Sequence, residues 1–206
     1  MSTQTKNSQQ AMTPKDALNM LIEGNKRFTN GKSADRNLME QVSQTSTGQY
    51  PFAVVLHCID SRVSAELLFD QGVGDVFSAR VAGNFVNEDI LGSMEFACKV
   101  AGSKLVVVLG HSKCGAVKGA CDGVELGNLT AMLSKLQPAV DKVSAVSGKK
   151  DSSDSQFVAD VSETNVHLTI ENIKNDSPVL NEMLQNNQID IVGGMYDVDT
   201  GKVKFY

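Results

Sequence analysis

Short apolar runs recur along the chain and are separated by longer segments in which apolar and polar residues alternate. The runs at residues 52–56 and 105–109 are rich in valine and contain no charged residue. Runs of this length and β-branched content are typical of strands buried in a parallel sheet. The last strand follows a hairpin-like turn at residues 196–202. In all, the pattern predicts strands over residues 52–58, 76–81, 104–110, 189–193 and 203–206.

The segments between these strands carry apolar residues at helical spacing. The first helix opens at Thr13-Pro14, a pairing that suits an N-cap followed by a first-turn proline, and it runs to Phe28. Because this helix lies outside the strand pattern, we expect it to form an N-terminal arm that packs on a partner subunit, followed by a polar loop over 31–48. Further helices are predicted over residues 64–70, 88–101, 114–120, 129–146, 158–174 and 177–185.

Strands that alternate with helices indicate an α/β fold with a mostly parallel central sheet flanked by helices. A chain of 206 residues with 41% apolar residues fits one globular domain, which we assign to residues 13–206. Residues 1–12 are polar and rich in Gln, Ser and Thr, and they lack the apolar centre of a secretory signal. We therefore expect a disordered tail there.

The net charge of −5 opposes binding to nucleic acid, because neutralising phosphates needs a basic surface. No apolar stretch is long enough to span a bilayer, so we expect a cytoplasmic protein with no membrane partner. The four cysteines allow two disulfides, but thiolate metal ligands need reduced sulfur. We expect Cys98 and Cys121 to be buried free thiols, and His57 to serve packing or a hydrogen bond.

Chemically distinctive residues follow two of the predicted strands. Cys58 ends the first strand, with Asp60 and Arg62 just beyond it, and His111 and Cys114 follow the third. The carboxyl ends of parallel strands meet at one edge of a sheet, so these residues should lie together. Two cysteines and one histidine are three zinc ligands. Asp60 either completes a closed site or pairs with Arg62 and leaves a position for water.

A structural zinc site is the alternative to a catalytic one. A permanently closed set made of Cys58, Asp60, His111 and Cys114 would belong to a non-catalytic, zinc-stabilised interaction protein. Such a site has no need of an arginine paired with its carboxylate. Arg62 therefore favours a catalytic centre, in which zinc acidifies a bound water and Asp60 orients the hydroxide that results.

Three segments give the chain a family resemblance, which extends from Pro14 to Tyr206. Residues 58–63, 80–84 and 108–116 together resemble the signature motifs of the β-class carbonic anhydrases. The resemblance implies reversible hydration of carbon dioxide to bicarbonate and a proton through zinc-bound hydroxide, with one Zn²⁺ per subunit. It implies Cys58, His111 and Cys114 as ligands and Asp60 with Arg62 as the catalytic dyad, Asp60 reaching the metal only in a closed state. It also implies a homodimer or a higher homo-oligomer.

The same resemblance suggests how the substrate is held. Gln49 and Phe77 fall where the family places a substrate-orienting amide and an aromatic wall, and the pocket is expected to be lined partly by the neighbouring subunit. We also assign Ala82 and Gly115 to the substrate pocket, the latter through its backbone N–H. The chain departs from plant-like members in having Phe96 after Glu95, and it contains no tryptophan, which makes the bicarbonate inhibition site of some bacterial members doubtful.

A related reaction uses the same scaffold. Carbon disulfide or carbonyl sulfide could be hydrolysed by the same ligands, with the access tunnel selecting the substrate. Assaying carbon disulfide beside carbon dioxide separates the two activities.

Overall fold

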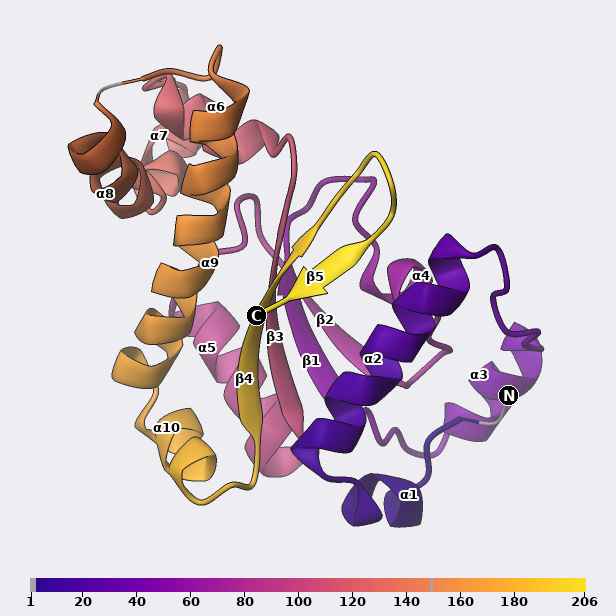
Figure 1. The fold of residues 1–206 in the computed structure, drawn as a ribbon. Coiled ribbons are helices and arrows are strands. Elements are labelled where there is room, and N and C mark those ends of the chain that lie inside the picture. Colours follow the sequence, from indigo (N-terminus) through magenta and orange to yellow (C-terminus); the bar gives the residue numbers. More distant parts are fainter. Residues whose placement is uncertain (1–2, 149) are drawn as a thin grey trace.

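The structure is a computed structural model that describes residues 3–148 and 150–206. At its centre is one five-stranded sheet with strand order β2-β1-β3-β4-β5 (Figure 1). Strands β1 to β4 are parallel, and β5 pairs antiparallel with β4. This confirms the predicted mostly parallel α/β fold. The strands are β1 (Ala53–His57), β2 (Val76–Arg80), β3 (Leu105–His111), β4 (Asp190–Tyr196) and β5 (Val203–Phe205).

Helices cover both faces of this sheet, as Figure 1 shows, with α9, α10 and α5 on one side and α2 with α4 on the other. The first helices are α1 (Lys6–Ala11), α2 (Pro14–Thr29), α3 (Leu38–Thr45), α4 (Ala65–Leu68), α5 (Glu88–Glu95) and the π-helix η1 (Phe96–Val100). The others are α6 (Gly115–Cys121), α7 (Gly127–Leu133), α8 (Gln137–Ser147), α9 (Ser155–Asp176) and α10 (Pro178–Gln185). Among the described residues, no helix is both long enough and apolar enough to cross a membrane.

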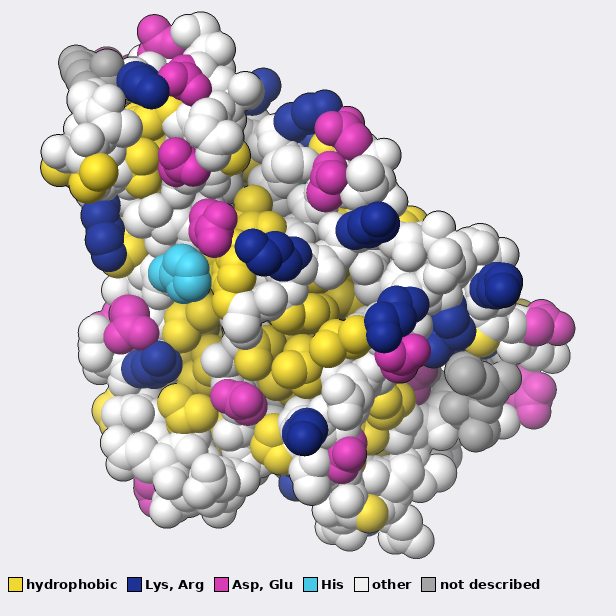
Figure 2. Space-filling view, viewed as in Figure 1, with side chains coloured by type: hydrophobic (Ala, Val, Ile, Leu, Met, Phe, Trp, Pro, Cys, Tyr) yellow, Lys and Arg dark blue, Asp and Glu magenta, His cyan; other side chains and the backbone are white. Residues whose placement is uncertain are grey.

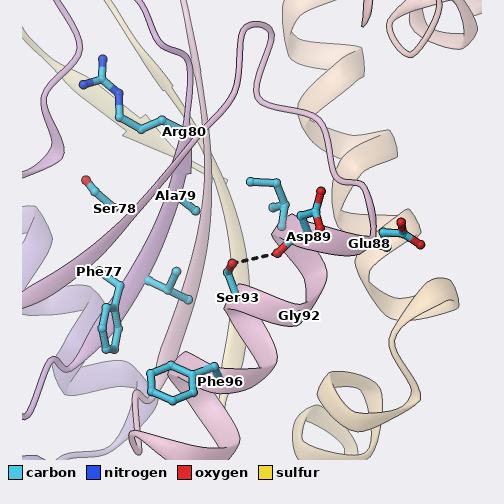
Figure 3. Close-up of a pocket in the computed structure, with 11 residues that line it drawn as sticks. Phe77, Ser78, Ala79, Arg80, Glu88, Asp89, Gly92, Ser93 and Phe96 are labelled. Carbon is cyan, nitrogen blue, oxygen red and sulfur yellow. Dashed lines mark hydrogen bonds between the residues drawn. The ribbon is translucent and has the colours of Figure 1, made fainter. Parts of the chain in front are cut away.

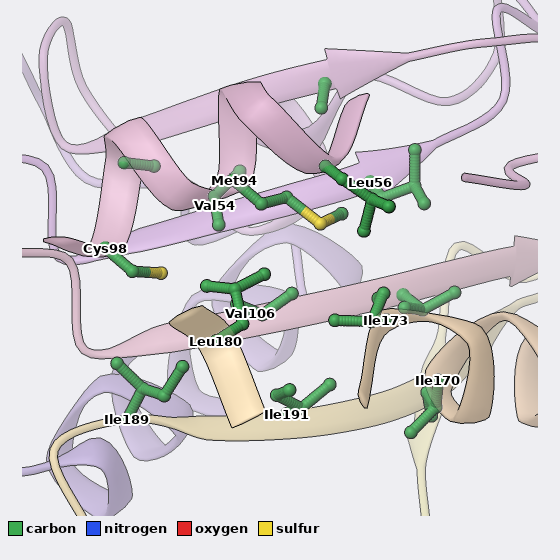
Figure 4. Close-up of a cluster of buried hydrophobic side chains, with 14 of the residues drawn as sticks. Val54, Leu56, Met94, Cys98, Val106, Ile170, Ile173, Leu180, Ile189 and Ile191 are labelled. Atoms are coloured by element: carbon green, nitrogen blue, oxygen red, sulfur yellow. The ribbon is translucent and has the colours of Figure 1, made fainter. Parts of the chain in front are cut away.

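The core is divided by the sheet into two apolar clusters. Alternate residues of each strand point to opposite faces, so Val54 and Leu56 face α5, α9 and α10, whereas Val55 faces α2 and α4. Figure 4 shows the first cluster, in which Met94 and Leu180 close over the strands. A third cluster lies beyond the carboxyl ends of the strands, among α6, α7, α8 and α9. It is the cluster that supports the candidate site.

The N-terminal segment differs from the disordered tail expected over residues 1–12, of which residues 1 and 2 lie outside the described part. Residues 6–11 form α1, because Thr5 and Ser8 cap one another reciprocally at its start. The Gln9 side chain is buried and donates hydrogen bonds to the carbonyls of Pro51 and Ala101, both at 2.8 Å. These contacts fasten α1 to the loops at the amino ends of the strands.

Two other segments also differ from the prediction. The polar segment expected to be a loop contains α3, whose first turn is capped by the Asn37 side chain. The long helix predicted over 129–146 is divided into α7 and α8, with Pro138 in the first turn of α8, where a proline is tolerated. Helix α2 packs on the sheet of its own chain through Ala17 and Leu21, and its packing on a partner remains a prediction.

Apolar side chains gather in the middle of one face of the molecule, over β4 and β5 and beside α2 (Figure 2). Strand β5 is an edge of the sheet, because β4 is its neighbour on one side and no strand of the described residues follows it on the other. Phe205 and Tyr206 at this edge are partly exposed. An edge strand with exposed apolar side chains is a surface prone to association.

A buried carboxylate fastens α2 to the segment that follows it. Asp70 accepts hydrogen bonds from the guanidinium groups of Arg27 and Arg36 and from the backbone N–H of Ala34. Burial of Asp70 opposes ionisation, but these donors outweigh it and hold the pKa of the carboxyl below its ordinary value. This cluster of one carboxylate and two guanidinium groups therefore stabilises the fold at neutral pH.

We expect Asp70→Asn to lower the free energy of unfolding by about 3 kcal/mol at pH 7, because it removes a buried negative charge that both Arg27 and Arg36 contact. Asn tolerates the positive φ of 47° at this position, so backbone strain does not contribute. The folded pKa lies below the unfolded one, so the stabilisation is lost as the pH falls through the folded value. Urea unfolding should show the difference from wild type shrinking below about pH 4.

Glu23→Gln is the matched control, because it removes an ion pair with Lys26 that is well exposed. Its cost should stay below about 0.5 kcal/mol. If both variants lowered the free energy of unfolding equally at pH 7, the buried Asp70 would stabilise the fold no more than an exposed ion pair does.

Candidate metal centre

Three donor side chains meet at the carboxyl ends of β1 and β3. Cys58 directly follows β1, His111 ends β3, and Cys114 precedes α6. The two strands are parallel neighbours with His57 opposite Leu109, so both strands end at the same edge of the sheet. The donor atoms of the three side chains all lie within 4.8 Å of one another, and all three residues are buried. The structure thus brings together the three predicted ligands.

The donor set is suited to a metal ion. His111 has its Nδ1 at 3.0 Å from the carbonyl of Ser112, which assigns the ring proton to Nδ1 and leaves Nε2 as a lone-pair donor. That Nε2 is buried and has no hydrogen-bond partner among the residues that the structure describes, an arrangement that is costly unless a ligand binds there. Two sulfurs and one imidazole nitrogen are the donors that zinc prefers.

The two thiols interact strongly. Cys58 Sγ and Cys114 Sγ are 4.0 Å apart, and the backbone N–H of Gly83 donates to Cys58 Sγ at 3.4 Å. The hydrogen bond from Cys114 lowers the pKa of the Cys58 thiol. The same contact, together with burial, raises the pKa of Cys114. Ionising both sulfurs therefore requires a neighbouring positive charge, which a divalent cation supplies.

Asp60 lies at the rim of this cluster and is held there by Arg62. Asp60 Oδ1 accepts from Arg62 Nε at 2.9 Å and Oδ2 accepts from Arg62 Nη2 at 2.8 Å, so the pair is bidentate. These hydrogen bonds hold the pKa of Asp60 well below its ordinary value. Asp60 Oδ2 also lies 4.0 Å from His111 Nε2. The carboxylate is thus ionised at the rim of the cluster. Of the two arrangements that the sequence allowed, the structure shows Asp60 paired with Arg62.

Arg80, which the sequence placed in a motif but gave no role, and His57 hold the loop between Cys58 and Asp60. Arg80, at the end of β2, donates from Nε to the Cys58 carbonyl at 3.3 Å and from Nη2 to the Asp60 carbonyl at 3.1 Å. His57 makes the expected hydrogen bonds, with Nδ1 3.0 Å from the Cys58 carbonyl and Nε2 3.0 Å from Ser78 Oγ. Burial and the charge of Arg80 lower the pKa of His57 to about 4, so its ring is neutral at neutral pH.

The other sequence-predicted residues divide into two groups. Ala82 precedes Gly83, whose N–H reaches Cys58, and Gly115 follows Cys114 directly, so both lie beside the ligands. Gln49 is exposed and precedes β1, at the end of the strand opposite to Cys58. Phe77 pairs with Val54 in the sheet, four residues before Cys58 and therefore roughly 13 Å from it along the strand.

Phe77 lies instead in a separate open cavity of about 680 Å³ (Figure 3). Its ring makes an edge-on contact with Phe96, with centroids 6.3 Å apart. Asp89 and Ser93 of α5 form another wall, and Arg80 lies at the end near the metal centre. Within one chain, Gln49 and Phe77 are thus not brought to the ligands. The cysteines outside the centre differ from each other, since Cys98 is buried as expected whereas Cys121 is half-buried.

Comparison with known proteins gives consistent results. Residues 53–203 match the family model described as "Carbonic anhydrase". The chain is 35% identical over 192 residues to "Carbonic anhydrase 2" of Mycobacterium tuberculosis, covering 92% of this chain and 91% of the relative. It is 34% identical over 194 residues to "Carbonic anhydrase" of Mycolicibacterium smegmatis, covering 93% and 92%.

Solved structures agree with these sequence relatives. The β-carbonic anhydrase CcaA superimposes with a TM-score of 0.73 at 27% identity, covering 92% of this chain and 87% of that one. The β-carbonic anhydrase CafA of Aspergillus fumigatus gives a TM-score of 0.73 at 25% identity, covering 93% and 91%. The similarity covers more than nine-tenths of this chain in both comparisons.

The geometry predicts that Cys114→Ala loses stoichiometric zinc, because two remaining donors cannot hold the ion against a competing chelator. Cys98→Ala is the matched control, since it removes an equally buried thiol from the opposite end of the core. Metal analysis after dialysis should give one zinc ion per chain for wild type and for Cys98→Ala. Retention of zinc by the Cys114 variant would contradict its assignment as a ligand.

Proposed function

The chain belongs to the β-class carbonic anhydrases, and we propose that it hydrates carbon dioxide reversibly to bicarbonate and a proton at a zinc site formed by Cys58, His111 and Cys114. One observation carries this proposal: the three donor atoms cluster while Asp60 is held by Arg62. Because Asp60 is not one of the clustered donors, three protein ligands would leave the fourth position on zinc for a reacting water. This is the arrangement of catalytic zinc sites, whereas structural sites use four protein ligands.

Zinc bound by these residues would supply a water molecule acidic enough to ionise near neutral pH. Asp60 Oδ2, which faces the cluster, accepts a hydrogen bond from the reacting water and orients its lone pair toward the carbon of the substrate. Arg62 keeps the charge of Asp60 compensated and its carboxylate out of the cluster. The pair therefore keeps the site open and directs the attack.

The substrate would bind beside the ligands, against Ala82 and Gly115. Gly115 has open space around its Cα, because an added Cβ would meet no atom within 4 Å. Its backbone N–H lies in the first turn of α6, where amides have no partner within the helix, and it can stabilise the charge that develops on the bicarbonate oxygens. The apolar methyl of Ala82 suits uncharged carbon dioxide.

We propose that a second copy of the chain completes the pocket, as a homodimer or a larger homo-oligomer. Within one chain, Gln49 and Phe77 lie toward the amino ends of the strands, far from the ligands. The cavity lined by Phe77 and Phe96 is open, which would allow it to face the metal centre of a partner. Gln49 would then orient the substrate and Phe77 would form an apolar wall. We place the protein in the cytoplasm, where thiolate ligands stay reduced.

Asp60→Asn should keep the zinc but reduce the rate of carbon dioxide hydration by roughly 10-fold to 100-fold, because an uncharged amide forms no ion pair with Arg62 and is a weaker acceptor for the hydrogen bond of the reacting water. Stopped-flow hydration assays combined with metal analysis measure both properties. Asp190→Asn at the opposite end of the sheet is the control and should behave as wild type. Normal turnover by the Asp60 variant would disprove its role.

Mixing two inactive variants tests the shared pocket. If Phe77 serves the partner's site, dimers that combine an Asp60→Asn chain with a Phe77→Ala chain contain one intact site. Random exchange should then restore about a quarter of the wild-type hydration rate, since half of the dimers are mixed and each has one good site. If Phe77 acts within its own chain, the mixture stays as inactive as its components.

A further inference from the structure

We propose that Asn165, in α9, is a positioning residue that holds the backbone donor of the Cys58 thiolate in place. The proposal concerns the ligand environment and rests on the proposed zinc site. Asn165 is far from Cys58 in the sequence, so the sequence alone gives no sign of this role.

Two hydrogen bonds connect Asn165 to the sulfur. Asn165 Nδ2 donates to the carbonyl of Gly83 at 2.9 Å in a fully buried contact. The N–H of Gly83 in turn donates to Cys58 Sγ at 3.4 Å. Gly83 thus accepts a hydrogen bond from Asn165 through its carbonyl and donates one to Cys58 Sγ through its N–H.

The glycine needs such support. Gly83 has φ of +83°, a conformation that glycine adopts freely but does not enforce. Rotation about its backbone would turn the N–H away from Cys58. A Cβ at this position would lie 2.8 Å from Leu136 Cδ1, so a side chain cannot fix the turn from within. Asn165 fixes it from outside by holding the carbonyl.

The surroundings of Asn165 indicate that its polarity serves this contact. The residue is 4% exposed and lies on α9 where that helix leaves the cluster of Cys58, Phe157 and Val161 and joins the main core at Val166. A buried amide among apolar side chains is costly unless its hydrogen bonds are made. The hydrogen bond to Gly83 satisfies the Asn165 amide, and without Asn165 the buried Gly83 carbonyl would lose this donor.

A hydrogen bond to a thiolate ligand steadies its charge and its direction. Partners that orient metal ligands typically change metal affinity by about 10-fold to 100-fold when removed. Asn165→Ala should therefore weaken zinc binding at least about 10-fold. It should also alter the sulfur-to-metal charge-transfer absorption of the Co²⁺-loaded protein, a signature that depends on the thiolates and not on catalysis.

The test measures zinc affinity by chelator competition and records the Co²⁺ spectrum for wild type, Asn165→Ala and Ser162→Ala. Ser162 is the matched control, because it is buried on the same helix but its hydroxyl donates to the Val158 carbonyl within α9. We expect Ser162→Ala to keep both properties. If Asn165→Ala does not fold, Asn165→Leu offers the same test, since an apolar side chain of similar size fills the space but cannot donate to the Gly83 carbonyl.

The outcomes separate this role from the zinc site itself. Wild-type protein that binds neither zinc nor Co²⁺ would disprove the metal centre and, with it, the role of Asn165. Wild type that binds both, beside a folded Asn165 variant with affinity within twofold of wild type and an unchanged Co²⁺ spectrum, would overturn the positioning role alone. Equal losses in the Asn165 and Ser162 variants would likewise overturn it, because they would report damage to α9.

Discussion

The parallel pairing of β1 with β3 is the constraint on which the site depends. Two adjacent parallel strands must end at the same edge, and here both are buried along their whole length, so apolar packing fixes their register. A shift by one residue would turn the alternating side chains to the wrong faces. Cys58 and His111 are therefore brought together by the energy of the core and need no mutual attraction to meet.

The ionic pair of Asp60 and Arg62 sets what the cluster can do. A carboxylate so close to two thiolates and an imidazole would join them on a cation if it were free. The bidentate contact with Arg62 gives Asp60 another partner of opposite charge. Arg80 adds to this by holding the backbone carbonyls of Cys58 and Asp60, which limits how far the loop between them can move. Under the proposed function, the reactivity of this centre depends on whether Asp60 binds Arg62 or the metal ion.

The sequence predicted what depends on residue type and periodicity. Valine-rich runs indicated β1 and β3, and the Cys and His residues that follow these runs indicated the ligands. It failed where structure depends on tertiary contacts: α1 is short and is fastened by Gln9 to backbone carbonyls, which no periodicity reveals. Asn165 was missed, and Arg80 was placed in a motif without a role, for the same reason, since contacts to backbone carbonyls leave no pattern in the sequence. Pro138 was a visible signal for the division between α7 and α8.

The ligand sulfurs are also members of the apolar cluster formed by α6, α7, α8 and α9. If these sulfurs hold zinc as proposed, metal retention and helix packing in this chain share the same atoms. Substitutions that repack these helices, even far from the pocket, will alter how tightly the sulfurs are held, and a protein that lost the ion would loosen the same helices. Evolution of this enzyme toward other temperatures or stabilities is therefore coupled to its chemistry, because neither property can drift without the other.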